Sequence, residues 1–419
     1  MVDEWHDMTL GDFVALQRGH DLTEPERRIG RVPVMGSAGQ NGFHDTALAK
    51  GPGIIVGRSG ASFGQVHYSA VDYWPHNTGL YVTDFKGNDP RFAFYFLKAL
   101  DFERYNSGSA QPSLNRNFIY PIPIRVPEPA QQKAIAEVLG ALDDKIELNR
   151  RMNATLEAMA RALFQSWFVD FDPVRAKLDG RQPVGMDEAT AALFPHSFED
   201  SAMGAVPRGW KVGTIEGATS LIIDHRGKTP KKLGSDWSEK GIPAVSAKNV
   251  KGGRLVRPDT FNFVSEELYA RWMKDELTHG DILMTSEAPL GELYYLAIDT
   301  RFCLSQRIFA MRANPTRCES TFLYYWLESP ACQTEIINRG TGTTVEGIRQ
   351  TELRKVTVLL PPLPIQKAAA KFRAAWTEQI HRNEEQSRTL ATLRDTLLPK
   401  LLSGELSVKG LEKTTEAFV

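Results

Sequence analysis

Two long stretches with very few helix-breaking residues constrain the fold of this chain most. The first follows Pro127 and Pro129 and ends near Phe168, and it is rich in Ala, Leu, Glu, Lys, Gln and Arg, which are strong helix formers. Apolar residues recur along it at the three- and four-residue spacing of a coiled-coil seam: Ile135, Val138, Leu142, Met152, Leu156, Met159 and Leu163. The pattern predicts one long helix that requires a partner helix.

The partner helix is predicted to lie in the same chain, because the sequence repeats itself at an offset of 234 residues. Residues 342–397 align with residues 108–163 without a gap, and Asn383 falls on Asn149. An Asn buried on a helical seam costs stability and fixes register, since its amide prefers another amide to an apolar neighbour. We therefore expect Asn149 and Asn383 to meet and to set the register, although common ancestry alone could also preserve them.

The remaining sequence repeats more loosely, with short apolar runs separated by turn residues, which is typical of compact α+β domains. The aligned pairs are Trp5 with Trp210, Pro33 with Pro243, Ile54 with Ile282, and Phe92 with Phe322. We expect an internal pseudo-two-fold repeat in which two similar globular domains are separated by two long helices paired as an antiparallel coiled coil. The predicted boundaries are domains at 1–128 and 207–363, helices at 129–172 and 364–409, a connector at 173–206 and a tail at 410–419.

Composition leads to expectations about the cores, the cysteines and the cellular location of this chain. Its 419 residues are 42% hydrophobic, which is enough for several cores. Cys303, Cys318 and Cys332 form no C-x-x-C pair, so neither disulfides nor zinc are expected and we interpret them as reduced structural thiols. No apolar run approaches the roughly 18 residues of a membrane span, and the acidic N-terminus is unlike a signal peptide. We expect a cytoplasmic chain with no membrane contact.

Motifs for catalysis are incomplete. Gly227-Lys228-Thr229 resembles the end of a phosphate-binding loop, but Ile222 stands where that loop requires its first glycine. Ala61 similarly stands where a nucleophile elbow around Ser59 would need glycine. We also find no histidine pair at metal-binding spacing. The sequence therefore predicts no catalytic residue, no metal site and no cofactor bound by this chain.

Charge is distributed unevenly although the net charge is only −1. Between His225 and Arg257 there are nine Lys or Arg residues against two acidic residues, with Gly, Ser and Asn interleaved. Such a segment favours an anion-binding surface, while an ordinary solvated face remains the alternative.

Several motifs resemble a known family. The segment SWFVDFDPVRAK after the first helix, LLPKLLSGEL at the end of the second, PRGW at the start of the second half, and the proline-rich Gln-Lys starts of both helices are similar to the specificity subunit of type I restriction-modification systems. The resemblance covers nearly the whole chain, and the domain interiors carry little of it.

The resemblance implies two target-recognition domains, each of which reads one half of a bipartite, asymmetric target in double-stranded DNA. It implies that the helices set the unspecified spacer and that the chain is itself non-catalytic. Two modification subunits, which carry S-adenosylmethionine and methylate adenines, and restriction subunits, which use ATP and Mg, would assemble on it. Segments 129–177 and 364–409 match the regions of the family that contact the methyltransferase. The predicted partner-facing residues are Trp167, Phe168, Phe171 and Asp172, which could alternatively only pack the helix end.

Candidate DNA contacts are side chains that suit phosphates or base edges, namely Lys and Arg for phosphate, Arg for guanine, and Asn or Gln for adenine. In the first domain they are Arg18, Ser37, Arg58, Ser107, Ser109, Gln111, Asn115 and Arg116. In the second they are Arg226, Lys228, Ser246, Lys248, Asn249, Arg339, Thr341, Thr343 and Arg349. The glycine-flanked polar loops 107–111 and 341–344 are equivalent under the repeat, and glycine would let their backbone approach phosphate.

Two alternatives to a DNA-reading subunit remain at the level of sequence. The chain could be an adaptor that scaffolds partner proteins through its paired helices without binding DNA. It could also be an enzyme that acts alone, although the missing catalytic motifs count against this interpretation.

Overall fold

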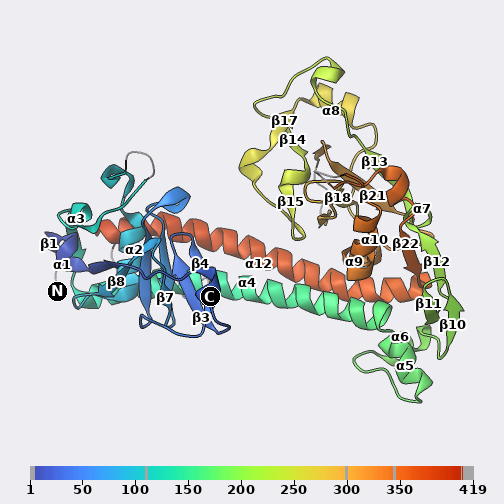
Figure 1. The fold of residues 1–419 in the computed structure, drawn as a ribbon, viewed down its shortest axis with the longest axis horizontal. Coiled ribbons are helices and arrows are strands. Elements are labelled where there is room, and N and C mark those ends of the chain that lie inside the picture. Colours follow the sequence, from blue (N-terminus) through green and yellow to red (C-terminus); the bar gives the residue numbers. More distant parts are fainter. Residues whose placement is uncertain (1–4, 109–111, 298–300, 343–345, 407, 409–419) are drawn as a thin grey trace. The chain divides into compact units, whose positions relative to one another are not determined.

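The computed structural model describes residues 5–108, 112–297, 301–342, 346–406 and 408. The chain divides into two compact units, which are drawn in Figure 1. The first unit comprises Met1–Arg151 and Asn383–Val419, and the second comprises Met152–Arg382.

Two long helices supply segments to both units. Helix α4 is Pro129–Phe164 and helix α12 is Leu363–Ser403. A π-helical turn, Gln165–Val169, extends α4 close to the predicted end of the helix. Gly140 lies inside α4 because a side chain there would collide with Arg91, whose guanidinium donates to the Gly140 carbonyl over 3.0 Å.

The first unit is built from short strands and helices together with its segments of α4 and α12. Its strands are β1 (Trp5–Thr9), β2 (Ala15–Arg18), β3 (Val32–Gly36), β4 (Gly39–His44), β5 (Gly53–Gly57), β6 (Val66–Ser69), β7 (Trp74–Pro75), β8 (Gly79–Asp84) and β9 (Pro123–Pro127). Its short helices are α1 (Leu10–Phe13), α2 (Pro90–Ala99) and α3 (Arg116–Ile119), with 3-10 turns at Glu24–Glu26, Gly60–Ser62 and Glu103–Tyr105. The strand orders are β2-β8-β5-β6, β4-β3-β7 and β1-β9.

The second unit contains more elements. Its strands are β10 (Phe198–Ser201), β11 (Gly204–Pro207), β12 (Lys211–Thr214), β13 (Thr219–Asp224), β14 (Ile242–Val245), β15 (Val250–Lys251), β16 (Arg254–Leu255), β17 (Asn262–Val264), β18 (Ile282–Thr285), β19 (Leu293–Tyr295), β20 (Cys303–Leu304), β21 (Ile308–Ala313) and β22 (Thr357–Leu360). Its helices are α5 (Asp172–Leu178), α6 (Glu188–Leu193), α7 (Ile215–Ala218), α8 (Glu266–Trp272), α9 (Ser320–Glu328), α10 (Pro330–Asn338) and α11 (Gln350–Leu353), with 3-10 turns at Lys231–Leu233, Ala247–Asn249 and Pro258–Thr260. The predicted connector contributes α5, α6, β10 and β11 to this unit.

The sheets of the two units repeat one topology. The second unit has strand orders β13-β21-β18-β19, β17-β14-β20 and β12-β22, which match those of the first unit strand for strand. In both three-stranded sheets one pairing is antiparallel and the other is parallel. The aligned residues lie on equivalent elements, with Ile54 on β5 and Ile282 on β18, and with Phe92 on α2 and Phe322 on α9. The predicted α+β fold with an internal repeat is confirmed.

Both long helices contribute residues to the core of each unit. The first unit takes the start of α4 and the end of α12, and the second takes the end of α4 and the start of α12. In the first unit, Ile135 and Leu139 of α4 are buried together with Leu401 of α12. In the second, Phe164 of α4 is buried together with Ile365 of α12. The start of one helix therefore packs beside the end of the other in each unit, which is an antiparallel pairing.

The predicted seam of α4 is wrong at Met152 and Met159, whereas Leu156 and Leu163 are half-buried. Met152 and Met159 are 38% and 46% exposed, whereas Asn153 and Ala160 are buried. The four-residue step from Asn149 leads to Asn153, so the buried residue at these two positions is the one after the predicted methionine. Apolar character misled the prediction because a polar residue and a small residue occupy the inner positions.

Candidate nucleic-acid interface

The first unit carries an open polar hollow of about 610 Å³, which we call the first-unit hollow. It lies where β2 and β5 end and where the segment before α3 crosses them. Its lining residues are Gln17, Arg18, Gly19, His20, Asp21, Arg58, Leu80, Ser107, Ser113, Leu114, Asn115, Arg116 and Asn117. Five of the eight predicted contact residues of this domain thus come together from positions far apart in the sequence.

Backbone hydrogen bonds fix the wall of this hollow. The Ser107 N–H donates to the Ser113 carbonyl over 2.9 Å, and the Leu114 N–H donates to the Arg58 carbonyl over 2.8 Å. The Asn115 side chain accepts from the Asn117 N–H over 3.0 Å and caps α3. The polar side chains therefore project from a backbone that is held in place, which suits recognition.

The other three predictions for this domain have different outcomes. Ser37 does not line the hollow; its carbonyl contacts the His67 ring at 3.0 Å. Ser109 and Gln111 lie outside the described residues. Sequence reasoning missed Gln17 and Asn117, although each is the immediate neighbour of a predicted arginine.

The second unit closes the equivalent loop with equivalent hydrogen bonds. The Thr341 N–H donates to the Gly347 carbonyl over 2.8 Å, and the Ile348 N–H donates to the Ser286 carbonyl over 2.9 Å. Thr341 and Gly347 correspond to Ser107 and Ser113 under the sequence repeat. Thr343 lies outside the described residues. Both units therefore present the same backbone frame at the same place in the topology.

Several predicted contacts of the second unit serve its own structure. Arg226 pairs with Asp224 at 2.7 Å and lies 4.5 Å from the centre of the Phe309 ring. Lys228 donates to the Trp272 carbonyl over 3.3 Å, and Arg339 pairs with Glu335 at 2.9 Å. The cationic groups of these side chains already donate to acceptors of the protein, so fewer of their N–H groups are available to a ligand.

Asn249 requires a correction, because it is completely buried. Its side-chain oxygen accepts from the Ser246 hydroxyl over 2.9 Å, and its amide donates to the Thr260 hydroxyl over 3.1 Å. Asn249 thus shapes the basic segment from inside and cannot touch DNA there. Lys248, Thr341 and Arg349 are exposed.

The predicted partner-facing aromatics are also mostly buried. Trp167 and Phe168 are 5% and 1% exposed and pack in the core of the second unit. Phe171 is half-buried against Trp210, with ring centres 5.5 Å apart. Packing of the helix end, which was the alternative interpretation, accounts for Trp167 and Phe168. Asp172 is exposed, and its carboxylate accepts from the Ser166 hydroxyl over 2.7 Å.

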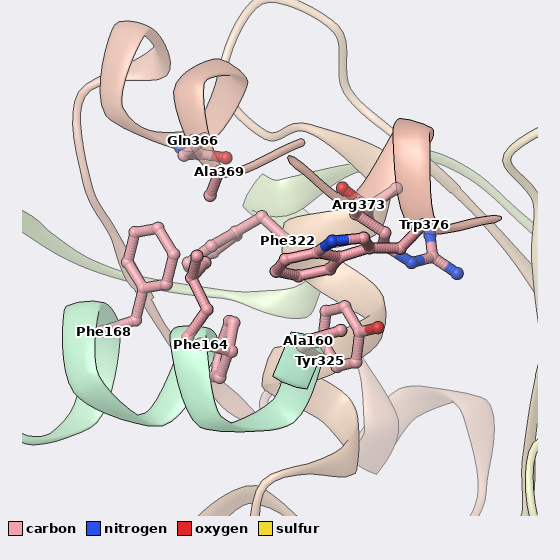
Figure 2. A pocket seen from close by; sticks show the side chains of 11 residues that line it. Ala160, Phe164, Phe168, Phe322, Tyr325, Gln366, Ala369, Arg373 and Trp376 are labelled. Atoms are coloured by element: carbon pink, nitrogen blue, oxygen red, sulfur yellow. The ribbon is translucent and has the colours of Figure 1, made fainter. Parts of the chain in front are cut away.

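Figure 2 shows how this helix end packs inside the second unit. Phe164 at the end of α4 and Phe168 of the following π-helical turn approach Phe322 of α9, and Arg373 and Trp376 of α12 complete the wall. The cavity between them has a volume of about 20 Å³, which is room for a single water and not for a ligand.

The register pair, Asn149 and Asn383, lies buried in the first unit. Asn149 is 1% exposed and Asn383 is 4% exposed. The Asn149 amide donates to the Asn383 backbone carbonyl over 3.2 Å and to the Gln386 side chain over 2.9 Å. The Asn149 side chain thus reaches across to the Asn383 backbone and to the side-chain amide of Gln386.

All three cysteines lie in the second unit. Cys303, Cys318 and Cys332 are free and buried, as predicted, and burial raises the pKa of the Cys303 thiol to about 12. In the described part of the chain, no group of three or more His, Cys, Asp or Glu side chains is placed to hold a metal ion. No helix among the described residues has the length and apolarity that crossing a membrane requires.

The sequence of this chain is similar to those of known proteins. The family model described as "Type I restriction modification DNA specificity domain" matches residues 2–158 and 207–388. The MjaIX specificity subunit of the type I restriction enzyme of Methanocaldococcus jannaschii is 25% identical over 325 residues, which cover 76% of this chain and 70% of the relative. The HindI specificity subunit of Haemophilus influenzae is 25% identical over 364 residues, which cover 76% of this chain and 77% of the relative.

A solved structure shares the fold. The S subunit of a type I restriction-modification system from M. genitalium superposes with a TM-score of 0.58 at 17% identity, and the match covers 96% of both chains. The two matched segments of the family model contain both sets of sheets described above. This chain belongs to the family of type I restriction modification DNA specificity domains.

Proposed function

We propose that this chain is the DNA sequence-specificity subunit of a type I restriction-modification complex and that each unit reads one half of a bipartite, asymmetric target. The observation that carries this proposal is the first-unit hollow, where cationic and amide side chains converge on a fixed backbone frame. The second unit repeats that frame with different side chains. Two equivalent but chemically different faces suit two different half-sites.

The chemistry of the hollow fits duplex DNA. Arg18 and Arg116 supply positive charge for phosphates, while Gln17, Asn115 and Asn117 supply the paired donors and acceptors that read adenine edges. A catalytic role for this chain is not part of the proposal. Methyl transfer and cleavage are assigned to partner subunits, which would bring S-adenosylmethionine, ATP and Mg.

The assembly that we propose has two modification subunits and further restriction subunits around this chain. Support comes from the family, whose curated relatives are named as specificity subunits of restriction enzymes. Segments 129–177 and 364–409 are the proposed contact regions. The spacer between the half-sites would be set by α4 and α12.

Salt dependence of DNA binding separates this proposal from an adaptor that does not touch DNA. We expect the purified full chain to bind a generic 40-bp duplex with a log–log salt slope of about −0.9 for each phosphate neutralised. Arg18→Gln should make the slope less negative by about 1, because Arg18 is exposed at the hollow. Lys133→Gln, on the exposed face of α4, is the matched control and should leave the slope unchanged. Fluorescence anisotropy between 50 and 300 mM salt measures it. Absence of duplex binding at 50 mM salt would support the adaptor instead.

A further inference from the structure

Arg58 differs from the other arginines of the first-unit hollow. It directly follows β5, every residue of which is buried. Its N–H donates to the Thr78 carbonyl over 2.9 Å, and its carbonyl accepts from the Leu114 N–H over 2.8 Å. The backbone of Arg58 is thus held from both sides, so the base of the side chain has little freedom.

The guanidinium of Arg58 has no acceptor among the described residues. Its Nε is buried and has no hydrogen-bond partner in the part of the chain that the structure describes. Arg18, by contrast, pairs with Asp21 at 3.4 Å, and Arg116 donates to the Leu16 carbonyl over 2.8 Å. Guanidinium stays charged at all working pH values, and an unsatisfied buried donor is costly, so Arg58 is poised for an acceptor that arrives with the ligand.

The surroundings of Arg58 favour a base edge over a phosphate. Asp21, which lines the same hollow, pairs with Arg18 at 3.4 Å and leaves Arg58 without a carboxylate partner within the described ranges. Asn115, Asn117 and Gln17 line the same hollow, and such side chains read base edges. Arg58 follows a buried strand and is half-buried, whereas phosphate contacts are commonly made by exposed cationic side chains, and Arg18 is one.

We propose that Arg58 reads guanine, through O6 and N7 in the major groove, within the half-site that the first unit binds. The inference rests on the proposed function and deepens it. A fork of two N–H donors matches the two acceptors of guanine, and this pairing discriminates against the other bases by about 1–3 kcal/mol.

The second unit cannot make this contact. Its residue at the same backbone position is Ser286, whose carbonyl accepts from Ile348 as that of Arg58 accepts from Leu114. Ser286 is 1% exposed, and its hydroxyl has no partner among the described residues. The next residue, Glu287, is an acid paired with Arg307 at 3.0 Å. An arginine at this backbone position is therefore present in the first unit only, which contributes to the asymmetry of the target.

Mapping of methylated adenines in cells that express the full chain with its modification subunit tests this inference. The wild-type motif should contain a fixed G·C pair in the half read by the first unit. Arg58→Gln should relax that one pair by roughly 10- to 100-fold in relative methylation, which corresponds to about 1–3 kcal/mol, and should leave the other half and the spacer unchanged. Arg18→Gln, in the same hollow, is the control and should keep the motif while lowering methylation at all sites.

The possible outcomes distinguish a failure of the proposed function from a failure of the guanine contact alone. Absence of any new motif with the wild-type chain contradicts the proposed function itself. A bipartite wild-type motif that Arg58→Gln leaves intact, with methylation lowered evenly, makes Arg58 a phosphate contact and overturns only this inference. If Arg58→Gln fails to form the complex, Arg58→Lys decides, because a lysine that preserves full base selectivity excludes the need for a guanidinium fork.

Discussion

Single glutamines anchor the start of each long helix. Gln132 is 1% exposed; its side-chain oxygen accepts from the Asp89 N–H over 3.0 Å, and its amide donates to the Pro127 carbonyl over 2.9 Å. Gln366 is fully buried and makes the equivalent bonds to Glu319 at 2.9 Å and to Pro361. One side chain therefore joins the preceding strand, the long helix and the N-terminus of a second helix in each unit.

Gln132→Met tests this anchor, because methionine preserves volume and helix propensity but leaves the Asp89 N–H and the Pro127 carbonyl without their partner. We expect the free energy of unfolding of the first unit to fall by about 2 kcal/mol. Denaturant-dependent hydrogen exchange of the Asp89 amide measures the loss at the site. Lys133→Met, one residue further on and exposed, is the control. A loss in Gln132→Met no larger than that in the control would contradict the anchoring role.

The sequence predicted that certain arginines of the first unit would lie together, but it did not predict which polar side chains are buried. Arg18, Arg58 and Arg116 were identified as candidates, and the structure places them around one hollow. Asn249 was misjudged, because a buried capping asparagine and an exposed adenine reader have the same sequence character. Burial and partners depend on contacts between distant segments, which single-sequence patterns do not contain.

At the scale of elements, the two helix ends dock by different chemistry. In the first unit, Arg394 of α12 donates to Asp143 of α4 over 2.6 Å, and the hydroxyl of Tyr95 donates to the same carboxylate over 2.7 Å. In the second unit, Arg373 of α12 lies over Tyr295 at 4.1 Å from the ring centre. The repeat therefore preserves topology while the polar contacts at the two junctions have diverged.

The register contact makes a prediction for α4 and α12. Changing Asn149 and Asn383 together to Leu should preserve or raise helix stability, since the buried amides are replaced by apolar groups. The expected cost is specificity, seen as methylation of targets with altered spacer length. The spacer distribution in a methylation map measures it, with Met152→Leu on the exposed face of α4 as the control. An unchanged spacer in the double variant would count against a register role.

The elements themselves were largely predictable. Proline-rich starts and strong helix formers predicted both long helices, and the repeat predicted that the two domains share one fold. The inner face of α4 was not predicted correctly, because Asn153 and Ala160 are buried there in place of Met152 and Met159. Which face is buried depends on the opposing helix, so periodicity alone left a shift of one residue.

At the scale of the whole molecule, the two units share one framework and differ in the side chains that they present. The loop that ends at Ser113 and the loop that ends at Gly347 are closed by the same backbone hydrogen bond. On that frame the first unit offers Arg58, whereas the second offers Glu287 beside a buried Ser286. A duplicated frame with divergent side chains provides two readers of different sequence in one chain.

The most direct test of this account is a genome-wide map of adenine methylation in cells that express this chain with its modification subunit, compared with cells that lack only this chain. The account predicts a new split motif, with two different half-sites on either side of a fixed unspecified spacer, that is present only when this chain is present. No new methylation despite a stable complex with an active modification subunit, or a motif that is continuous and symmetric, would contradict it.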